Sequence, residues 1–114
     1  MIEKYEKDDK IGVLVSYGFG AGWSTWSNEY GIDLALDKRI IEKFLKLREK
    51  EIEYGQAKKE MKVFLESIGY NGVYTGGLDG LCLEMVDEGT PIKITEYDGA
   101  ESLECGYCDY TIIW

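Results

Sequence analysis

The sequence predicts an α+β fold in which a small, mostly antiparallel sheet of about four to five short strands packs against two helices. Three observations support this prediction. An apolar, β-branched run opens the chain, two segments with helical spacing occupy its middle, and short runs separated by glycine turns fill its end. With 114 residues and a hydrophobic content of 45%, the chain is expected to form a single domain over residues 1–114.

The first expected element is a buried strand over residues 11–16, which are mainly apolar and β-branched. The charged residues 1–10 before it are expected to be frayed. Residues 17–26 follow the strand, and glycines at positions 18, 20 and 22 allow backbone angles that other residues resist. We therefore expect residues 17–26, the glycine-aromatic loop, to form a loop or tight turn.

Two helices are expected, from about residue 38 to 50 and from about residue 56 to 68. Asp37 is placed to cap the first helix, and Gly69 is a stop signal after the second. Each segment places its apolar residues on one stripe, as a helix packed on a core requires. The stripes contain Ile40, Ile41, Phe44 and Leu45 in the first helix, and Met61, Phe64, Leu65 and Ile68 in the second.

The end of the chain is expected to form short antiparallel strands, because eight of the 14 glycines lie in the last 46 residues and mark frequent turns. The candidate strands are residues 72–75, 81–86, 92–97 and 110–114. The turns between them are Gly76-Gly77, residues 88–91 and Asp98-Gly99.

Charge and composition exclude several functions. Residues 70–114 contain nine acids and one base, Lys93, within a chain of net charge −9, so direct nucleic-acid binding is disfavoured. No apolar run approaches the roughly 20 residues of a membrane span, which disfavours a membrane partner. The absence of histidine removes the commonest general base and metal ligand. We therefore expect no catalytic residue, cofactor or metal, and an enzyme using Glu96 or Asp98 as general base is a third alternative.

The three cysteines, Cys82, Cys105 and Cys108, are an odd number in a chain whose start resembles no signal peptide. Cys105 and Cys108 are separated by two residues, a spacing that occurs in thiol–disulfide redox sites and in metal sites. A redox site needs a helix at its first cysteine to lower the pKa of the thiol, but here a strand-like segment follows. A zinc site would need a carboxylate or a second chain. Plain reduced cysteines in a cytoplasmic protein are expected.

The glycine-aromatic loop is the candidate ligand site. Its aromatic faces can stack on a nucleobase, for about 1–3 kcal/mol per base, while glycine N–H groups and hydroxyls can meet phosphate or ribose. The glycine spacing matches neither a dinucleotide fingerprint nor an ATP-binding loop. The alternative is that the tryptophans fill the core beside a tight turn. The candidate residues are Tyr17, Gly18, Phe19, Gly20, Trp23, Ser24, Thr25 and Trp26.

The acids Glu96, Asp98 and Glu101 lie around a predicted turn and provide a possible second contact to the ligand. Their spacing matches no calcium-binding loop. The alternative is a solvated acidic face whose main effect is solubility.

Residues 13–26 (VLVSYGFGAGWSTW) and 88–102 (EGTPIKITEYDGAES) resemble a widespread group of small phage and prophage proteins. These share an opening strand with a Gly/aromatic turn and a later Glu-Tyr-Asp-Gly-x-Glu element, and residues 74–77 are a weaker third match. The resemblance brings no established activity and no catalytic residues.

The resemblance implies a phage context, in which small acidic proteins often counter host defence. One implied mechanism is capture of a nucleotide-derived immune signal, commonly by a homo-oligomer. The other is stoichiometric inhibition of a host defence protein, as by an anti-CRISPR protein, through an acidic face in residues 70–114. Our first hypothesis is a non-catalytic binding protein that sequesters a small nucleotide-like ligand in the cytoplasm of an infected bacterium.

Overall fold

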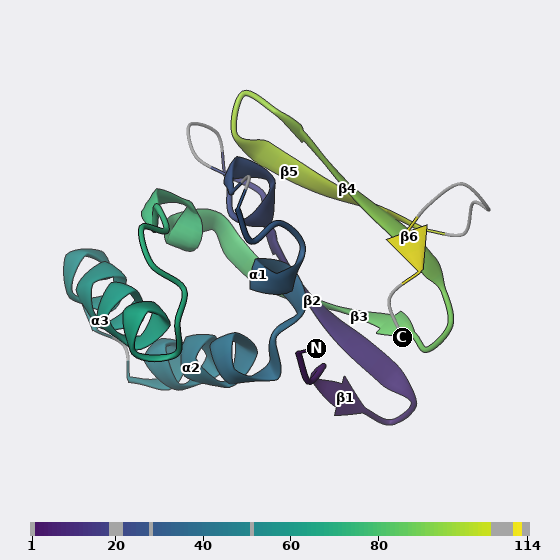
Figure 1. The fold of residues 1–114 in the computed structure, drawn as a ribbon, viewed down its shortest axis with the longest axis horizontal. Coiled ribbons are helices and arrows are strands. Elements are labelled where there is room, and N and C mark those ends of the chain that lie inside the picture. Colours follow the sequence, from purple (N-terminus) through teal and green to yellow (C-terminus); the bar gives the residue numbers. More distant parts are fainter. Residues whose placement is uncertain (1, 19–21, 28, 51, 106–110, 113–114) are drawn as a thin grey trace.

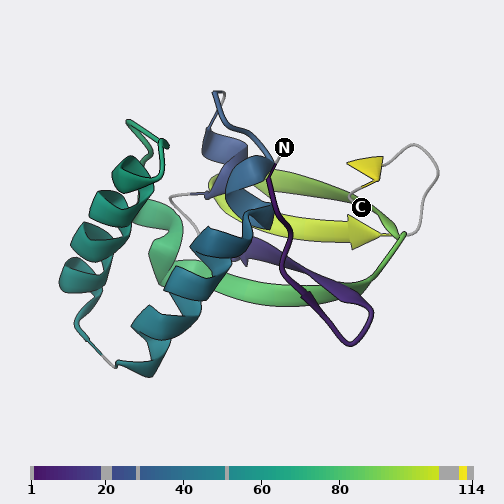
Figure 2. The same cartoon turned by 60° about the horizontal axis from the view of Figure 1, so that its bottom comes forward.

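The computed structural model describes residues 2–18, 22–27, 29–50, 52–105 and 111–112. Its strands form two antiparallel sheets, with strand orders β1–β2–β3 and β5–β4–β6. Helices α2 and α3 lie on one side of the β2–β3 pair, and the β4–β5 hairpin crosses over it on the other (Figures 1 and 2). The predicted α+β class is therefore confirmed.

The elements follow one another as strand, helices and strands. In chain order they are β1 (Glu6–Lys7), β2 (Lys10–Ser16), the 3-10 turn η1 (Ser24–Trp26), α1 (Asp33–Leu36), α2 (Lys38–Glu49), α3 (Tyr54–Ser67), the 3-10 turn η2 (Gly76–Gly80), β3 (Leu81–Asp87), β4 (Pro91–Tyr97), β5 (Ala100–Cys105) and β6 (Thr111–Ile112).

Strand β2 is the centre of the molecule because both of its faces are buried. Ile11, Val13 and Val15 pack with residues of α1 and β4, including Ile92. Leu14 points the other way, into the cluster formed by α2 and α3. Alternate side chains of a strand face opposite sides, so a strand between two layers needs the continuous apolar run found here.

Both hairpins that flank this core use two-residue turns with positive φ. Asp8 and Asp9 (φ 52° and 62°) join β1 to β2, and Asp98 and Gly99 (φ 53° and 88°) join β4 to β5. Such turns match the twist of the strands. The turn at Asp98-Gly99 is thus confirmed. The prediction that residues 1–10 are frayed is wrong for β1, which pairs with β2 in residues 6–7.

The two predicted helices are confirmed as α2 and α3. Asp37 caps α2 by accepting a hydrogen bond of 2.9 Å from Arg39 N, and Gly69 follows α3 with φ of +99°. The Asp37 side chain is only 1% exposed and also binds the Arg39 guanidinium (2.8 Å) and the Tyr70 hydroxyl (2.7 Å). Burial opposes ionisation of Asp37, but these hydrogen bonds outweigh burial and lower its pKa below the usual value.

Two predictions for the end of the chain differ from the structure. Residues 72–75 form no strand; the buried Val73 packs in the helix-side core, and the chain continues into η2. Strand β5 was not predicted, because its run Ala-Glu-Ser has weak β propensity. A strand was predicted at residues 110–114. Residues 111–112 of it form β6, which pairs with Pro91 and Ile92 of β4, and the other three residues lie outside those described.

Within the described ranges, no helix combines the length and the apolar character that crossing a membrane requires.

Candidate functional site

The described parts of the glycine-aromatic loop are organised around one buried carboxylate, that of Glu101 on β5, which is 1% exposed. Its Oε1 accepts a hydrogen bond from Ser16 N (2.9 Å). Its Oε2 accepts hydrogen bonds from Trp23 N (2.7 Å), Thr25 N (3.1 Å) and Thr25 Oγ1 (2.6 Å). The residue before the loop and the end of the loop are therefore fixed to the same side chain.

The register of the β4–β5 hairpin explains how Glu101 reaches the loop. Glu96 and Glu101 pair across the hairpin and face the same way as Ile94 and Leu103, toward β2 and η1. Burying a carboxylate costs several kcal/mol unless hydrogen bonds compensate it, and four neutral donors do so here. Glu101 therefore acts as an internal anion for the loop.

This arrangement changes how the loop can recognise a ligand. From the sequence, the N–H groups and hydroxyls of the loop are expected to form hydrogen bonds with a phosphate or ribose of the ligand. In the structure, the N–H groups of Trp23 and Thr25 and the Thr25 hydroxyl bind Glu101. Glu101, which the sequence offers as a possible second contact, is itself buried and already accepts these hydrogen bonds.

Trp23 is a core residue in this structure. Its ring is 1% exposed, and its Nε1 donates a hydrogen bond of 2.8 Å to the carbonyl of Leu34 in α1. Ser24 is also buried, at 4% exposed. Trp23 therefore matches the alternative prediction, in which a tryptophan fills the core beside a tight turn. Phe19 and Gly20 lie outside the described residues.

Trp26 has the opposite environment, because it lies on the surface and is 44% exposed. Its ring stacks with that of Tyr74, which is 60% exposed, at a centroid distance of 5.8 Å and an interplanar angle of 18°. Glycines allow both rings to approach the backbone. A Cβ at Gly22 would lie 2.7 Å from Trp26 Cδ1, and one at Gly76 would lie 2.5 Å from the Tyr74 ring.

Glu96 orients the Trp26 ring. Its Oε2 accepts hydrogen bonds from Trp26 Nε1 (3.3 Å) and from Gly99 N (2.9 Å). Among the described residues, both hydrogen bonds to the Glu96 carboxylate go to Oε2, so Oε1 can accept one from a ligand. We call Trp26, Tyr74 and Glu96 the aromatic surface. Asp98 lies beyond it, at the start of the β4–β5 turn.

A small hollow of about 190 Å³ adjoins η1 and is lined by Ser24, Thr25, Ile32, Lys93 and Ile94. Lys93 is the single base in residues 70–114. The hollow is smaller than the about 300–1,000 Å³ of most ligand pockets, so it can hold only part of a small molecule, such as one phosphate group.

Tyr17 and Gly18 contact the start of β3. The backbone N–H of Tyr17 donates to Gly80 O (2.9 Å), and a Cβ at Gly80 would lie 2.5 Å from Gly18 N. Partial burial, together with the charge and hydrogen bond of Glu84, raises the pKa of Tyr17 to about 12. The hydroxyl of Tyr17 therefore stays protonated beside Glu84.

The structure joins the three segments on which the phage resemblance rests. Glu101 binds the glycine-aromatic loop, Trp26 stacks on Tyr74, and the Ser16 hydroxyl donates a hydrogen bond of 2.6 Å to Gly77 O. Sequence reasoning did not assign Tyr74 to the site. The one local signal for it is the Gly76-Gly77 step, a place where an aromatic ring can lie close to the backbone.

Four of the described acids of residues 70–114 lie in separate parts of the fold. Asp79 lies in η2, Glu84 faces Tyr17, Asp87 pairs with Lys10 at 3.5 Å, and Glu101 is buried. Reversing the charge of Glu101 would therefore disrupt the loop and would not test an acidic docking face.

Cys82 and Cys105 are exposed free thiols, and Cys108 lies outside the described residues. Partial burial and the nearby Glu84 raise the pKa of Cys105, so its thiol is less reactive than an ordinary one. Over the described part of the chain, no group of three or more Cys, Asp or Glu side chains is arranged to hold a metal ion. Comparison with family models, curated proteins and solved structures gave no match.

Proposed function

We propose that the protein is a non-catalytic binding protein that captures a small nucleotide-like ligand by stacking its base on the aromatic surface. The observation that carries this proposal is the exposed, stacked pair of Trp26 and Tyr74 beside the carboxylate of Glu96. Exposed aromatic rings beside a hydrogen-bonding group favour a flat ligand with polar edges.

The ring spacing indicates how the base binds. A base held between two rings needs their planes about 7–8 Å apart, twice the optimal carbon–carbon separation. The centroids of Trp26 and Tyr74 are 5.8 Å apart, so the base stacks on an outer face of the pair. Stacking of this kind contributes about 1–3 kcal/mol per base.

Glu96 supplies selectivity among bases. Its carboxylate accepts hydrogen bonds, so it favours a base whose edge carries an amino group, as adenine, guanine and cytosine do. A hydrogen bond to a charged acceptor contributes about 1.5–3 kcal/mol. Uracil has no amino group and offers only its ring N3–H, which lies between two carbonyl oxygens that the carboxylate repels, so it binds more weakly.

The phosphate of the ligand contacts Lys93, and not the N–H groups of the glycine-aromatic loop. The N–H groups of Trp23 and Thr25 and the Thr25 hydroxyl bind Glu101, whereas Lys93 lines the hollow formed with Ser24 and Thr25. One lysine in a chain of net charge −9 favours a ligand with few phosphates.

The proposed biological role is sequestration of a nucleotide-derived immune signal by a phage protein in the cytoplasm of the infected host. It draws support from the resemblance to small phage proteins, whose three segments are the ones that meet around the aromatic surface. Capture without turnover is supported by the lack of histidine and by the structural use of Glu101.

The proposal is tested by titrating the protein with AMP, adenosine and uridine in a calorimeter. Trp26→Ala and Tyr74→Ala should each weaken adenosine binding about 10-fold or more, which corresponds to 1.4 kcal/mol or more of lost stacking. The matched control is Tyr97→Ala, which removes another exposed tyrosine and should leave the affinity unchanged. Equal affinities of wild type and both stacking variants would contradict the proposal.

A further inference from the structure

The charges of the chain are segregated between its layers. Residues 38–62, which contain α2 and most of α3, hold nine of the 13 bases and five acids. The rest of the chain holds four bases and 17 acids. The helical layer is therefore positive, whereas the remainder of the molecule, with its two sheets, is negative.

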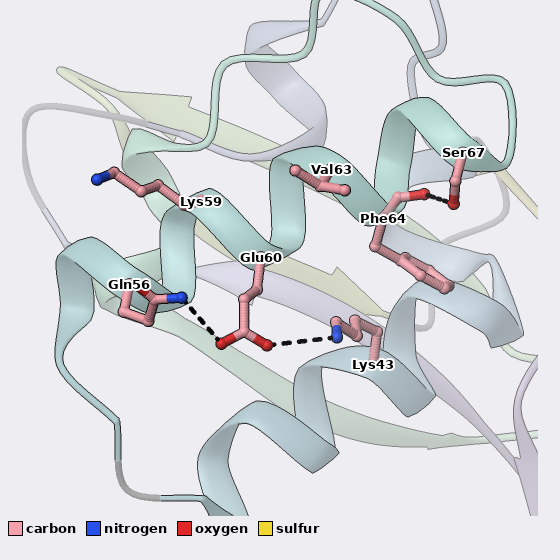
Figure 3. A pocket seen from close by; sticks show the side chains of 7 residues that line it. All are labelled: Lys43, Gln56, Lys59, Glu60, Val63, Phe64 and Ser67. Atoms are coloured by element: carbon pink, nitrogen blue, oxygen red, sulfur yellow. Dashed lines mark hydrogen bonds and ion pairs between the residues drawn. The ribbon is translucent and has the colours of Figure 1, made fainter.

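A groove between α2 and α3 lies in this positive layer and is open to a partner. Its cavity measures about 420 Å³, and its lining comprises Lys43, Gln56, Lys59, Glu60, Val63, Phe64 and Ser67 (Figure 3). Val63 is an apolar side chain that is 68% exposed, and Phe64 is half-buried beside it. Val63 and Phe64 together give the groove an apolar part against which another apolar group can pack.

The rim of the groove is cationic. Glu60 forms ion pairs with Lys43 at 3.7 Å and with Lys50 at 3.6 Å, so two cations share its single charge. Lys59 extends from α3 away from this cluster (Figure 3). An apolar side chain beside an acid would therefore complement the groove in both shape and charge.

The tip of the β4–β5 hairpin has this complementary character. Tyr97 is 79% exposed, the highest value among the large exposed apolar side chains described, and Asp98 follows it in sequence. The two-residue Asp98-Gly99 turn fixes the pairing of β4 with β5 up to the tip. Figure 1 shows this turn at the top of the molecule and α3 at the lower left, so the tip and the groove are separate surfaces.

We propose that the hairpin tip of one copy docks in the α2–α3 groove of a second copy. The Tyr97 ring packs on Val63 and Phe64, and Asp98 pairs with Lys59. Aromatic rings such as Tyr97 and Phe64 attract each other edge-to-face or offset. Each copy uses one surface as donor and another as acceptor, so the contact is heterologous and builds either a ring or an open chain.

The net charge of −9 does not prevent this contact. At physiological ionic strength the Debye length is about 8 Å, so charges on distant parts of two copies are screened, whereas close ion pairs are not. A single side chain in a groove buries far less than the about 1,200–2,000 Å² of a stable interface, so the association is weak.

The test is sedimentation velocity of the full chain from about 10 µM to about 1 mM, a range that covers weak complexes. The weight-average mass of the wild type should rise above the monomer value at high concentration. It should return to the monomer value near 1 M salt, where the Debye length is about 3 Å. Tyr97→Ala and Lys59→Glu should remain monomeric.

A charge exchange distinguishes docking from loss of folding. Lys59→Glu and Asp98→Lys should each be monomeric alone, because each puts like charges in the contact. An equal mixture of the two variants should associate, since every contact between unlike copies then joins a cation to an anion. Circular dichroism checks that each variant is folded. A wild type that stays monomeric, or association that survives Tyr97→Ala and Lys59→Glu, would overturn the proposal.

Discussion

Replacing Glu101 with alanine removes the acceptor of four hydrogen bonds that hold the glycine-aromatic loop. The N–H groups of Ser16 and Trp23 belong to residues that are 0% and 1% exposed, so both lose their partner in the interior. Each buried donor without a partner costs about 1–3 kcal/mol, or about 2–6 kcal/mol for the pair. Removing Glu101 also removes the cost of burying its charge. We therefore expect a loss near the lower part of this range, about 3 kcal/mol.

Urea unfolding followed by tryptophan fluorescence measures this loss as a lower midpoint at an unchanged slope. Glu101→Gln should lose about half as much, because its amide keeps one acceptor oxygen but turns an N–H₂ group toward a donor. The matched control is Glu88→Ala, where the side chain is exposed and the change should stay within about 0.5 kcal/mol. A loss below about 1 kcal/mol for Glu101→Ala would refute the structural role of this carboxylate.

Three further predictions concern the α2 cap and the proposed ligand contacts. The pKa of Asp37 is lower in the folded chain than its usual 3.8, so the Asp37 charge stabilises the fold above about pH 4, and this contribution is lost as the pH falls through the folded value. The urea midpoints of wild type and Asp37→Asn should therefore differ most at neutral pH and converge below about pH 4; a gap that is constant with pH would count against this reasoning. Gly76→Ala places a Cβ 2.5 Å from the Tyr74 ring, so calorimetry should show adenosine binding weakened about 10-fold, and an unchanged affinity would exclude Tyr74 from the contact. Lys93→Ala should weaken binding of AMP several-fold but leave adenosine unaffected, whereas equal losses would show that Lys93 does not contact the phosphate.

The helices were predictable because their signals are local. Asp37, the apolar stripe of α2 and the stop at Gly69 lie within or beside the elements they define. Strand β5 depends on distant residues instead. Glu101 is stabilised there by donors 76–85 positions earlier in the chain. A glutamate in such a run resembles a solvated acid until its partners are known.

The candidate site was predictable only in part, for a similar reason. Trp23 and Trp26 are three residues apart in one loop, yet Trp23 is buried by its contact with Leu34, and Trp26 lies on the surface. No local pattern distinguishes them, since their burial depends on where α1 packs. Tyr74 reaches Trp26 only through the fold, because 48 positions separate them in the sequence.

Native mass spectrometry tests the central claim, capture of a nucleotide-like ligand, most directly. Wild type and a double variant, Trp26→Ala with Tyr74→Ala, are incubated with a nucleotide extract from bacteria whose defence is active. We expect wild type to retain an added mass that denaturation releases unchanged, and the double variant to retain none. Absence of a bound mass on wild type, equal retention by both proteins, or release of an altered molecule would contradict capture by the aromatic surface.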